Sequence, residues 1–482
     1  MASPIIGKSR SNLPNSAAQP SEMSENLTLK REIGLTSAIS LVAGTMIGSG
    51  IFMSPEWVLH NIGSPGGSLI IWAACGLVVI FGALSYAELG ILIKESGGDY
   101  IYILRTFGSL PAFLFAFSSI IVVRPAGVAA VSLSFAEYAL VPFYSGCSPP
   151  QVMIKCIAIS CILFLTLVNC LSVRLAMSMM NIFTAAKLLA LLVIAVGGLV
   201  LLAQGQTHSF QDAFQNTNME AGAIGIAFYQ GLWSFDGWNV LNSVTEEVKR
   251  PDVTLPRALM IAIPLVACFF LLVNVSYFAA MTSVEFLTSG AIAITWGNKV
   301  LGNWVWLMSL AVALSCFGSV NGTFFCGSRV CYIAAREGHM PDFLSMVHIR
   351  YFTPFPALIF TSVVSIIMVI PASFNKIVNI FRWVFLTTHN YSMKLISQPL
   401  FDYFYVPIII PIIFLMISIY LVLTPIIDQP QLEFFYVILF IFSGIIFYFP
   451  LVHYKYCPAC LRKLTIYMQL LMEVAATEKD MN

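Results

Sequence analysis

Two glycine-rich stretches of this sequence could bind a small charged molecule through their backbone. The first covers residues 44–50 (GTMIGSG) and the second residues 234–237 (SFDG). Glycine at this density weakens a helix, and an interrupted helix leaves N–H and C=O groups unpaired. N–H groups freed in the first stretch could bind a carboxylate at the positive end of a half-helix. Carbonyl groups freed near Met46 and Trp233 could accept from an ammonium group. A free amino acid carries both charges on one carbon, so the pattern predicts an amino acid as the ligand.

Two side chains at the second stretch could add selectivity. Asp236 is an ionisable residue within an apolar segment, where burial is costly and residues of this kind are usually functional. It could hold a cationic side chain of the ligand or couple the movement of a gate; alternatively, it caps loose N–H groups of the interrupted turn. Trp233 could close over the ligand as a lid or simply pack into the core.

A third candidate is Lys187, the last residue of the stretch 183–187 (FTAAK). A fixed ammonium can occupy the space that a sodium ion would fill and hold carbonyl groups of the first and eighth spans. The alternative is that its side chain extends to the cytosolic interface. Glu88 and Arg124 are also flanked by apolar residues, and we interpret both as structural, with Arg124 and Pro125 forming a helix kink.

The segments that must position these groups are strongly apolar. The chain has 482 residues, of which 59% are hydrophobic and 10% charged, and its mean hydropathy is +0.87; soluble domains have roughly 25% charged residues. The apolar runs are about 20 residues long, as a membrane-crossing helix requires. The sequence therefore predicts an all-α integral membrane protein with about twelve transmembrane helices. The predicted spans are 34–58, 67–93, 111–135, 152–171, 180–203, 222–244, 257–281, 301–326, 354–373, 376–398, 405–427 and 433–454.

Lys and Arg residues gather in alternate loops, which sets the orientation in the membrane. The loops 59–66, 136–151, 204–221, 282–300 and 428–432 hold almost none, with Lys299 as an exception. Both termini are therefore predicted to be cytosolic. Residues 1–30 are interpreted as a disordered N-terminal tail without the apolar core of a signal peptide. Residues 31–455 form the transmembrane domain, and residues 456–482 a cytosolic C-terminal tail.

The two glycine-rich stretches fall in the first and sixth spans, five spans apart. Paired broken helices in matching positions are typical of transporters with inverted repeats and a site at the bilayer midplane. The pattern predicts a 5+5 inverted repeat with broken helices 1 and 6, as in the leucine-transporter-like fold. Close helix packing through small residues is the alternative; it would explain Gly44 and Gly48 but not Asp236.

The sequence gives no indication of enzyme activity or of nucleic-acid binding. The sequence contains no Walker loop, zinc-ligand pattern or nucleophile elbow, so no enzyme activity, cofactor or metal is predicted. A net charge of +1 gives no indication of a nucleic-acid partner. Most of the 11 cysteines lie in apolar spans as small hydrophobic residues. Cys147 differs, because it lies in a predicted extracellular loop with no obvious local partner.

Several motifs together resemble the light, catalytic subunits of heteromeric amino acid transporters, within the amino acid–polyamine–organocation superfamily. The resemblance extends over about residues 29–473. The motifs are residues 44–52 (GTMIGSGIF), 87–90 (AELG), 96–100 (SGGDY), 181–187 (NIFTAAK), 236–239 (DGWN), 245–247 (TEE) and 336–340 (REGHM). Within the family the sequence most resembles the system b-zero-plus subgroup, which exchanges cystine and cationic for neutral amino acids. An aromatic-preferring subgroup is the alternative.

The resemblance implies a role for each candidate residue. Trp233 matches an external gate, and Asp236 an acidic residue linked to cationic substrates. Lys187 matches a lysine that replaces a sodium site, and Cys147 a cysteine that forms a disulfide with a single-span glycoprotein heavy subunit. The residues that match the segment binding the substrate backbone are Met46, Ile47, Gly48, Ser49 and Gly50.

These roles imply a sodium-independent amino acid exchanger that works by alternating access in the plasma membrane. The alternatives are an ion-coupled symporter, an aromatic-preferring transporter and an inactive member of the family.

The tenth predicted span departs from the family pattern. Family members have an apolar span there, whereas residues 379–394 (NIFRWVFLTTHNYSMK) include Arg382, His389 and Lys394. Each charge near the centre of a helix costs roughly 2.5–3.5 kcal/mol on insertion. We therefore expect residues 376–398 to insert poorly on their own, which puts activity in question.

Overall fold

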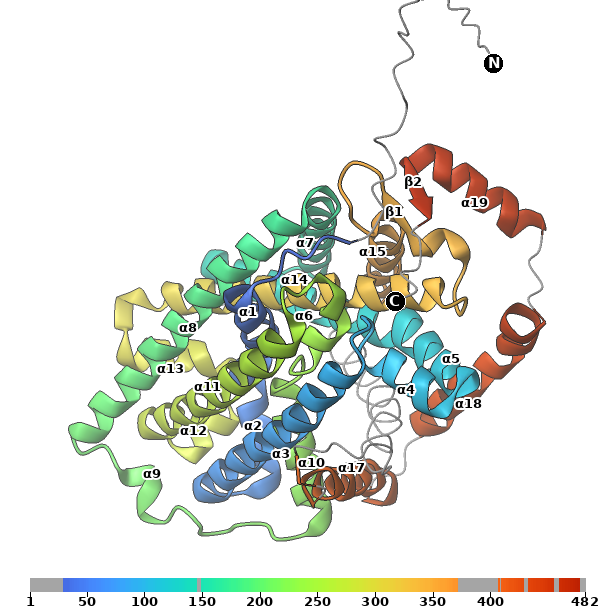
Figure 1. Ribbon diagram of the computed structural model, residues 1–482. Helices are drawn as coiled ribbons and strands as arrows, with labels where there is room; N and C mark the ends of the chain where they lie inside the picture. The colour runs from blue at the N-terminus through green and yellow to red at the C-terminus, as the bar shows by residue number, and fades with distance from the viewer. Residues whose placement is uncertain are drawn as a thin grey trace, which may run out of the picture.

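The computed structural model describes residues 29–144, 149–371, 406–407, 409–428, 432–454 and 459–476. Most of this part of the chain is helical, and the helices are packed side by side (Figure 1). The predicted tenth span, Cys147 and most of the predicted N-terminal tail lie outside the described residues. Predictions about their structure therefore remain predictions.

Six helical segments of the described chain are long and apolar enough to cross a membrane, and a bent pair makes a seventh candidate. The bent pair is α1 (Leu35–Met46) and α2 (Gly50–Ile62), whose axes differ by 42°. Four of the six are single helices: α3 (Pro65–Leu92), α7 (Gln151–Leu171), α8 (Val173–Ala203) and α11 (Pro251–Ala280). The fifth is the continuous run Ser109–Phe143, which consists of α5 (Ser109–Ser118), η1 (Ser119–Val123), α6 (Arg124–Leu140) and η2 (Val141–Phe143). The sixth is the run Gly302–Arg336, which consists of η4 (Gly302–Trp304) and α14 (Trp306–Arg336).

Further predicted spans correspond to shorter helices. The sixth consists of α10 (Ala221–Ser234) and η3 (Val240–Glu247), which are separated by a non-helical segment. Three more apolar helices are α15 (Phe355–Val369), α17 (Ile409–Asp428) and α18 (Leu432–Tyr448). The chain is thus a multi-span helical protein, although the number twelve remains a prediction.

Local signals explain where the long helices begin. Ser64 caps α3 by accepting a hydrogen bond from the Gly67 N–H group (3.2 Å), and Pro65 occupies the first turn. Ser172 caps α8 in the same way through Leu175 (3.2 Å). Beyond its cap, α8 is apolar on nearly every face, as expected of a helix in lipid. Its exposed residues include Leu189, Leu192, Val193, Val196, Leu199 and Val200.

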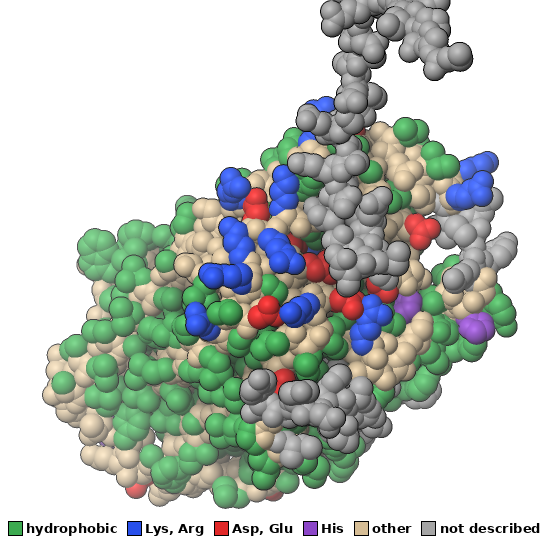
Figure 2. Space-filling view, in the orientation of Figure 1, with side chains coloured by type: hydrophobic (Ala, Val, Ile, Leu, Met, Phe, Trp, Pro, Cys, Tyr) green, Lys and Arg blue, Asp and Glu red, His purple; other side chains and the backbone are tan. Residues whose placement is uncertain are grey.

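Shorter elements connect the spans. They are α4 (Asp99–Phe107), α9 (His208–Gln211), α12 (Ser283–Leu287), α13 (Ile292–Val300), η5 (Asp342–Ser345), η6 (Phe449–His453) and α19 (Ala459–Met472). Lys299, the exception to the charge pattern, forms a salt bridge with Glu285 (2.7 Å) on α12. In Figure 2, Lys and Arg side chains gather over one part of the visible face while hydrophobic side chains cover its flank, as the positive-inside rule requires.

The structure departs from a purely helical fold at one point. Strands β1 (Met346–His348) and β2 (Val474–Ala476) form an antiparallel pair, with Val347 opposite Ala475. The pair joins the segment before α15 to the end of the chain, and the sequence analysis did not predict it. Three-residue strands carry too short a pattern to be recognised in a sequence.

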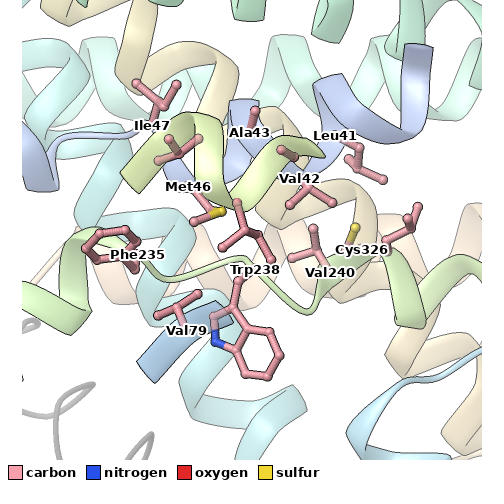
Figure 3. Close-up of a cluster of buried hydrophobic side chains, with 14 of the residues drawn as sticks. Leu41, Val42, Ala43, Met46, Ile47, Val79, Phe235, Trp238, Val240 and Cys326 are labelled. Atoms are coloured by element: carbon pink, nitrogen blue, oxygen red, sulfur yellow. The ribbon is translucent and has the colours of Figure 1, made fainter. Parts of the chain in front are cut away.

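The main hydrophobic core surrounds the interrupted helices. It draws side chains from α1, α3, the α10–η3 region, α11 and α14. Figure 3 shows part of this core, where Met46 of α1, Val79 of α3 and the residues Phe235 and Trp238 come together. The interruptions therefore lie in the interior of the protein, where irregular backbone can be tolerated in a membrane protein.

Candidate functional site

The first glycine-rich stretch is a true interruption of the helix. Helix α1 ends at Met46, Ile47 leaves helical geometry with ψ 84°, and α2 begins at Gly50. Among the described residues, no backbone bond is donated by the N–H groups of Ser49, Gly50 or Ile51. These donors lie at the N-terminus of α2, where a negative group is favoured.

The second stretch is interrupted as well. Helix α10 ends at Ser234, and Gly237 has φ +98°. This left-handed conformation favours glycine. A Cβ atom at Gly237 would also lie 2.6 Å from the Cγ2 atom of Thr45 on α1, so glycine is required for close approach too.

The two interruptions touch each other. A Cβ atom on Gly50 would lie 2.6 Å from the Cα atom of Ser234, which means that α2 and α10 meet backbone to backbone. Together with the contact between Gly237 and Thr45, this places both broken helices around one central point. The sequence predicted this meeting from the spacing of the breaks, and the glycines make it sterically feasible.

Lys187 points at the first interruption. Its side chain is 2% exposed, and Nζ donates to the carbonyl oxygens of Gly44 and, at 2.7 Å, of Ile47. The alternative in which Lys187 extends to the cytosolic interface is therefore wrong for this structure. A buried ammonium bound to carbonyl oxygens has the surroundings that a small cation would have.

The eighth span contributes hydroxyl groups here, whereas we had expected carbonyl groups. Ser315 donates to the Ile47 and Gly48 carbonyls (3.1 and 3.3 Å), and Ser319 donates to the Thr45 carbonyl (2.8 Å). The α14 backbone satisfies its own carbonyls, which leaves its serine side chains to hold the break. Sequence analysis missed both serines; their spacing of four residues, which places them on one helix face, is the only signal.

Asp236 lies in the non-helical segment after α10 and is half-buried. Arg124 is the opposite charge that acts on its carboxylate most strongly, and Asp99 adds a like charge. Arg124 begins α6 directly after the π-helical turn η1, a feature often found at functional sites. We had interpreted Arg124 as part of a kink; the structure adds that its charge acts on the site.

Trp233 is also half-buried, one residue before the end of α10. It packs against a second hydrophobic cluster that includes residues of α6, α7 and α14. This position lies beside the break, as a lid would require, and also fits the core-packing alternative. Both interpretations of Trp233 remain open.

Comparison with known proteins identifies the family of this chain. Residues 33–464 match the amino acid permease family. The chain belongs to the amino acid permease family. It is therefore a transporter-type membrane protein rather than an enzyme.

Similar proteins are found over most of the permease. The human b(0,+)-type amino acid transporter 1 is 46% identical, over 95% of this chain and 96% of its own length. The human cystine/glutamate transporter is 39% identical, over 88% and 86% of the two chains. The human large neutral amino acids transporter small subunit 2 is 44% identical, over 73% and 66%. The resemblance to light subunits of amino acid transporters is thus confirmed.

Three further family motifs of the permease, in residues 96–100, 245–247 and 336–340, meet in a polar cluster at the ends of α14 and η3. Arg329 and Glu247 form a fully buried salt bridge (2.8 Å), each side chain 1% exposed. Glu246 binds Arg336 through both carboxylate oxygens (2.9 and 2.7 Å). Sequence analysis had quoted these motifs without assigning a role to them.

The loop before α4 closes this cluster. Ser96 and Glu246 exchange two hydrogen bonds, from the Ser96 N–H to Oε1 (3.0 Å) and from the Glu246 N–H to the Ser96 Oγ atom (2.8 Å). On the other side, the Ile33 N–H donates to the Glu247 carbonyl (3.0 Å), and the Lys249 N–H donates to the Ile33 carbonyl (2.9 Å). The segment before α1, the loop before α4 and the end of η3, which lie far apart in the sequence, are thereby held together by hydrogen bonds.

His339 of the last motif lies between two hydroxyl groups outside the spanning helices. The hydroxyls of Tyr100 and Ser109 contact Nδ1 and Nε2, each at 2.8 Å. Burial lowers the pKa of His339 to about 4, so the ring is neutral near pH 7. Burial also raises the pKa of Tyr100, which keeps its hydroxyl protonated.

No group of three or more metal-ligating side chains is found in the described ranges. The unpaired N–H groups at the start of α2 suit a ligand that carries a carboxylate group.

Proposed function

We propose that this permease is a sodium-independent amino acid exchanger that works by alternating access. The observation that carries the proposal is the direct contact of two broken helices, with Lys187 bound to the carbonyls of the first break. Unpaired N–H groups at α2 suit the carboxylate of the substrate, and Met46, Ile47, Gly48, Ser49 and Gly50 would form its cradle. A positive charge already occupies the place where a sodium ion would bind, so transport would need no sodium.

The polar cluster of α14 and η3 would act as the inner gate. Alternating access requires that one side of the site be closed while the other opens. The salt bridges Arg329–Glu247 and Arg336–Glu246 fasten η3 to α14 on the side where Lys and Arg residues gather. Release of the substrate to that side would require these links to separate.

The charges near the site favour neutral amino acids as the main substrates. Arg124 acts on Asp236 and so partly balances its charge before any substrate arrives. Cationic amino acids and cystine are further candidates, because Asp236 would still attract a positive side chain. A transporter that prefers aromatic amino acids is the second candidate. Aromatic amino acids have uncharged side chains, so they too would suit a site in which Arg124 partly balances the charge of Asp236.

The permease would work as the light subunit of a heterodimer in the plasma membrane, with both termini in the cytosol. One relative is named as a small subunit of a transporter, and two others, named as transporters, match 95% and 88% of this chain. The partner would be a single-span glycoprotein attached through Cys147. The transmembrane domain would comprise residues 31–455 with twelve spans in a 5+5 inverted repeat.

Proteoliposomes containing the purified heterodimer would test this function. We expect uptake of labelled tyrosine, leucine or arginine only when the vesicles are preloaded with amino acid, and at equal rates in sodium and choline buffers. Empty vesicles that accumulate substrate in the presence of sodium would indicate a symporter instead. No uptake under any condition, by a heterodimer that elutes as a single species, would indicate an inactive member.

A further inference from the structure

Two arginines at the start of α11 have no carboxylate partner among the described residues. Arg250 directly precedes the helix, Arg257 lies in its second turn, and both side chains are exposed. Neither takes part in a salt bridge within the described part of the chain. The acidic residue between them, Asp252, is bound to Lys94 at 2.9 Å. Because arginine keeps its charge at any physiological pH, both guanidinium groups are available for an external anion.

Four other arginines at the same end of the spanning helices do have carboxylate partners. The pairs are Arg105–Glu95, Arg174–Glu32, Arg336–Glu246 and Arg350–Glu473. The positive-inside rule explains why basic residues gather at this end, but it does not require that any of them lack an acidic partner. Arg250 and Arg257 therefore differ from these four in what their charges can bind.

The start of α11 lies at the level of the lipid headgroups. The helix has 30 residues, which corresponds to a length of about 45 Å at about 1.5 Å per residue. A bilayer is about 40–45 Å thick when its headgroup regions are included. A helix of this length that crosses the membrane therefore places its first turns beside the headgroups.

The exposed face of α11 continues from the arginines into apolar side chains. Four of these side chains are 36–47% exposed: Val253, Met260, Ile261 and Leu265. Arg257 follows Val253 by four residues and precedes Met260 by three, so it lies on the same helix face. Two turns separate it from Arg250, which begins this face. In Figure 2, hydrophobic side chains adjoin the region in which Lys and Arg gather.

Hydrogen bonds fix the backbone that carries Arg250. The residue has φ +49°, a left-handed conformation that arginine rarely adopts. Its carbonyl accepts from the N–H groups of Val253 and Thr254 (3.2 and 3.0 Å), and the Thr254 hydroxyl donates to the Lys249 carbonyl (2.7 Å). Since this turn is already ordered, binding of a ligand would cost little further backbone entropy.

The order of groups along α11 matches that of a phospholipid. Guanidinium groups form paired hydrogen bonds with phosphate oxygens, and acyl chains pack against apolar side chains. A soluble anion or an acidic peptide would contact the arginines and leave the apolar face uncovered. A headgroup with a net negative charge fits best, because the choline group of a zwitterionic lipid would lie close to the same two positive charges.

We propose that α11 binds an anionic phospholipid of the adjacent leaflet, with the headgroup at Arg250 and Arg257 and the acyl chains along the apolar side chains that follow. In the predicted orientation this is the cytosolic leaflet, where anionic lipids attract basic residues. The proposal does not depend on transport activity.

Native mass spectrometry of the purified full-length protein in detergent measures this binding. Phosphatidylserine and phosphatidylcholine with identical acyl chains are added in separate titrations. We expect phosphatidylserine to bind at least about fivefold more tightly, the contribution of about one basic residue at an anionic surface. Equal affinities would overturn the proposal. Displacement of phosphatidylserine by equimolar glycerophosphoserine, which has the headgroup but no acyl chains, would also overturn it.

Two double variants separate a defined site from general attraction between charges. Arg250→Gln with Arg257→Gln removes the two unpaired charges, whereas Arg105→Gln with Arg350→Gln removes two paired charges at the same end. We expect the Kd for phosphatidylserine to rise at least about tenfold in the first variant and less than about twofold in the second. An equal rise in both would refute the site.

A single substitution keeps the test decisive if the first double variant does not elute as a folded species. Arg257→Gln changes one exposed side chain on the lipid-facing side of α11. It should raise the Kd for phosphatidylserine about fivefold and leave the Kd for phosphatidylcholine unchanged. An unchanged Kd for phosphatidylserine would contradict the assignment of the headgroup to this arginine.

Discussion

At the scale of single residues, the candidate site depends on how Lys187 is neutralised. The side chain has no carboxylate partner among the salt bridges of the described residues. Its charge is instead held by carbonyl oxygens of the first break. Removing the ammonium would leave those carbonyls buried with fewer donors, at a cost of about 1–3 kcal/mol for each unsatisfied group.

The first prediction concerns Lys187→Met, which keeps much of the length of the side chain and removes its charge. We expect uptake in choline buffer to fall at least about tenfold, because about 1.4 kcal/mol of lost stabilisation in the working conformation already has this effect. Sodium should restore part of the rate by occupying the vacated position. Initial rates in the two buffers provide the measurement, with Lys249→Met on an exposed loop as the control. A wild-type rate that itself collapses without sodium would contradict the assignment.

The second prediction concerns Asp236→Asn, which preserves size and removes charge. A desolvated charge contact is commonly worth a few kcal/mol, whereas the backbone cradle serves every substrate. The variant should therefore raise the KM for arginine far more than the KM for tyrosine. If Asp236 only caps the interrupted turn, both substrates should lose equally. Poor arginine uptake by the wild-type protein would indicate the aromatic-preferring alternative.

Charged residues of the candidate site were recognisable in the sequence, whereas its serine residues were not. The positions of Lys187 and Asp236 stood out because charge is rare within apolar spans. Ser315 and Ser319 did not, since serines are common in membrane helices as packing residues. The influence of Arg124 on Asp236 depends on the fold, because these residues lie far apart in the sequence and no local pattern specifies that they approach each other.

At the scale of helices, the glycine pattern predicted both interruptions, and the structure confirms them in α1–α2 and α10–η3. The π-helical turn η1 and the β1–β2 pair were not predicted, because both are fixed by contacts between distant segments. The same applies to the Arg329–Glu247 salt bridge, whose members are 82 residues apart. Charged residues of this kind are recognisable singly, but their pairing is a product of the fold.

The third prediction concerns this buried pair. Arg329→Met leaves Glu247 as an uncompensated buried charge, which typically costs about 3–5 kcal/mol. The Tm of the purified protein should drop markedly, and the double variant with Glu247→Met should recover much of the loss. Lys94→Met removes one member of an exposed pair with Asp252 and serves as the control, with an expected effect below about 1 kcal/mol. A double variant as unstable as the single one would contradict this account.

The fourth prediction concerns residues 376–398, which lie outside the described residues. Arg382, His389 and Lys394 fall in or beside the central part of this predicted span. We expect the isolated segment to insert inefficiently and to require neighbouring helices, because insertion penalties of roughly 2.5–3.5 kcal/mol per central charge accumulate. Glycosylation mapping with the segment placed in a reporter protein measures this directly. Efficient insertion of the isolated segment would show that the apolar residues between the charges suffice.

At the scale of the whole molecule, the two ends of the spanning helices differ in charge. The salt bridges Arg329–Glu247 and Arg336–Glu246 lie on the side rich in Lys and Arg. The connection between η2, which ends at Phe143, and α7, which begins at Gln151, lies on the side that is poor in them. The positive-inside rule therefore predicts that this connection is extracellular.

The last prediction follows from this placement and concerns Cys147, which lies in that connection but outside the described residues. An extracellular thiol is in an oxidising environment and can form a disulfide with a second protein. Cys147→Ser should therefore abolish a high-mass band on non-reducing gels of cell membranes, while the band of the light chain under reducing conditions stays unchanged. Cys156→Ser is the matched control, because Cys156 is an exposed cysteine nearby on α7. A high-mass band that persists in Cys147→Ser and disappears in Cys156→Ser would transfer the link to α7. A band that persists in both single variants would show that neither thiol alone is required for the covalent assembly.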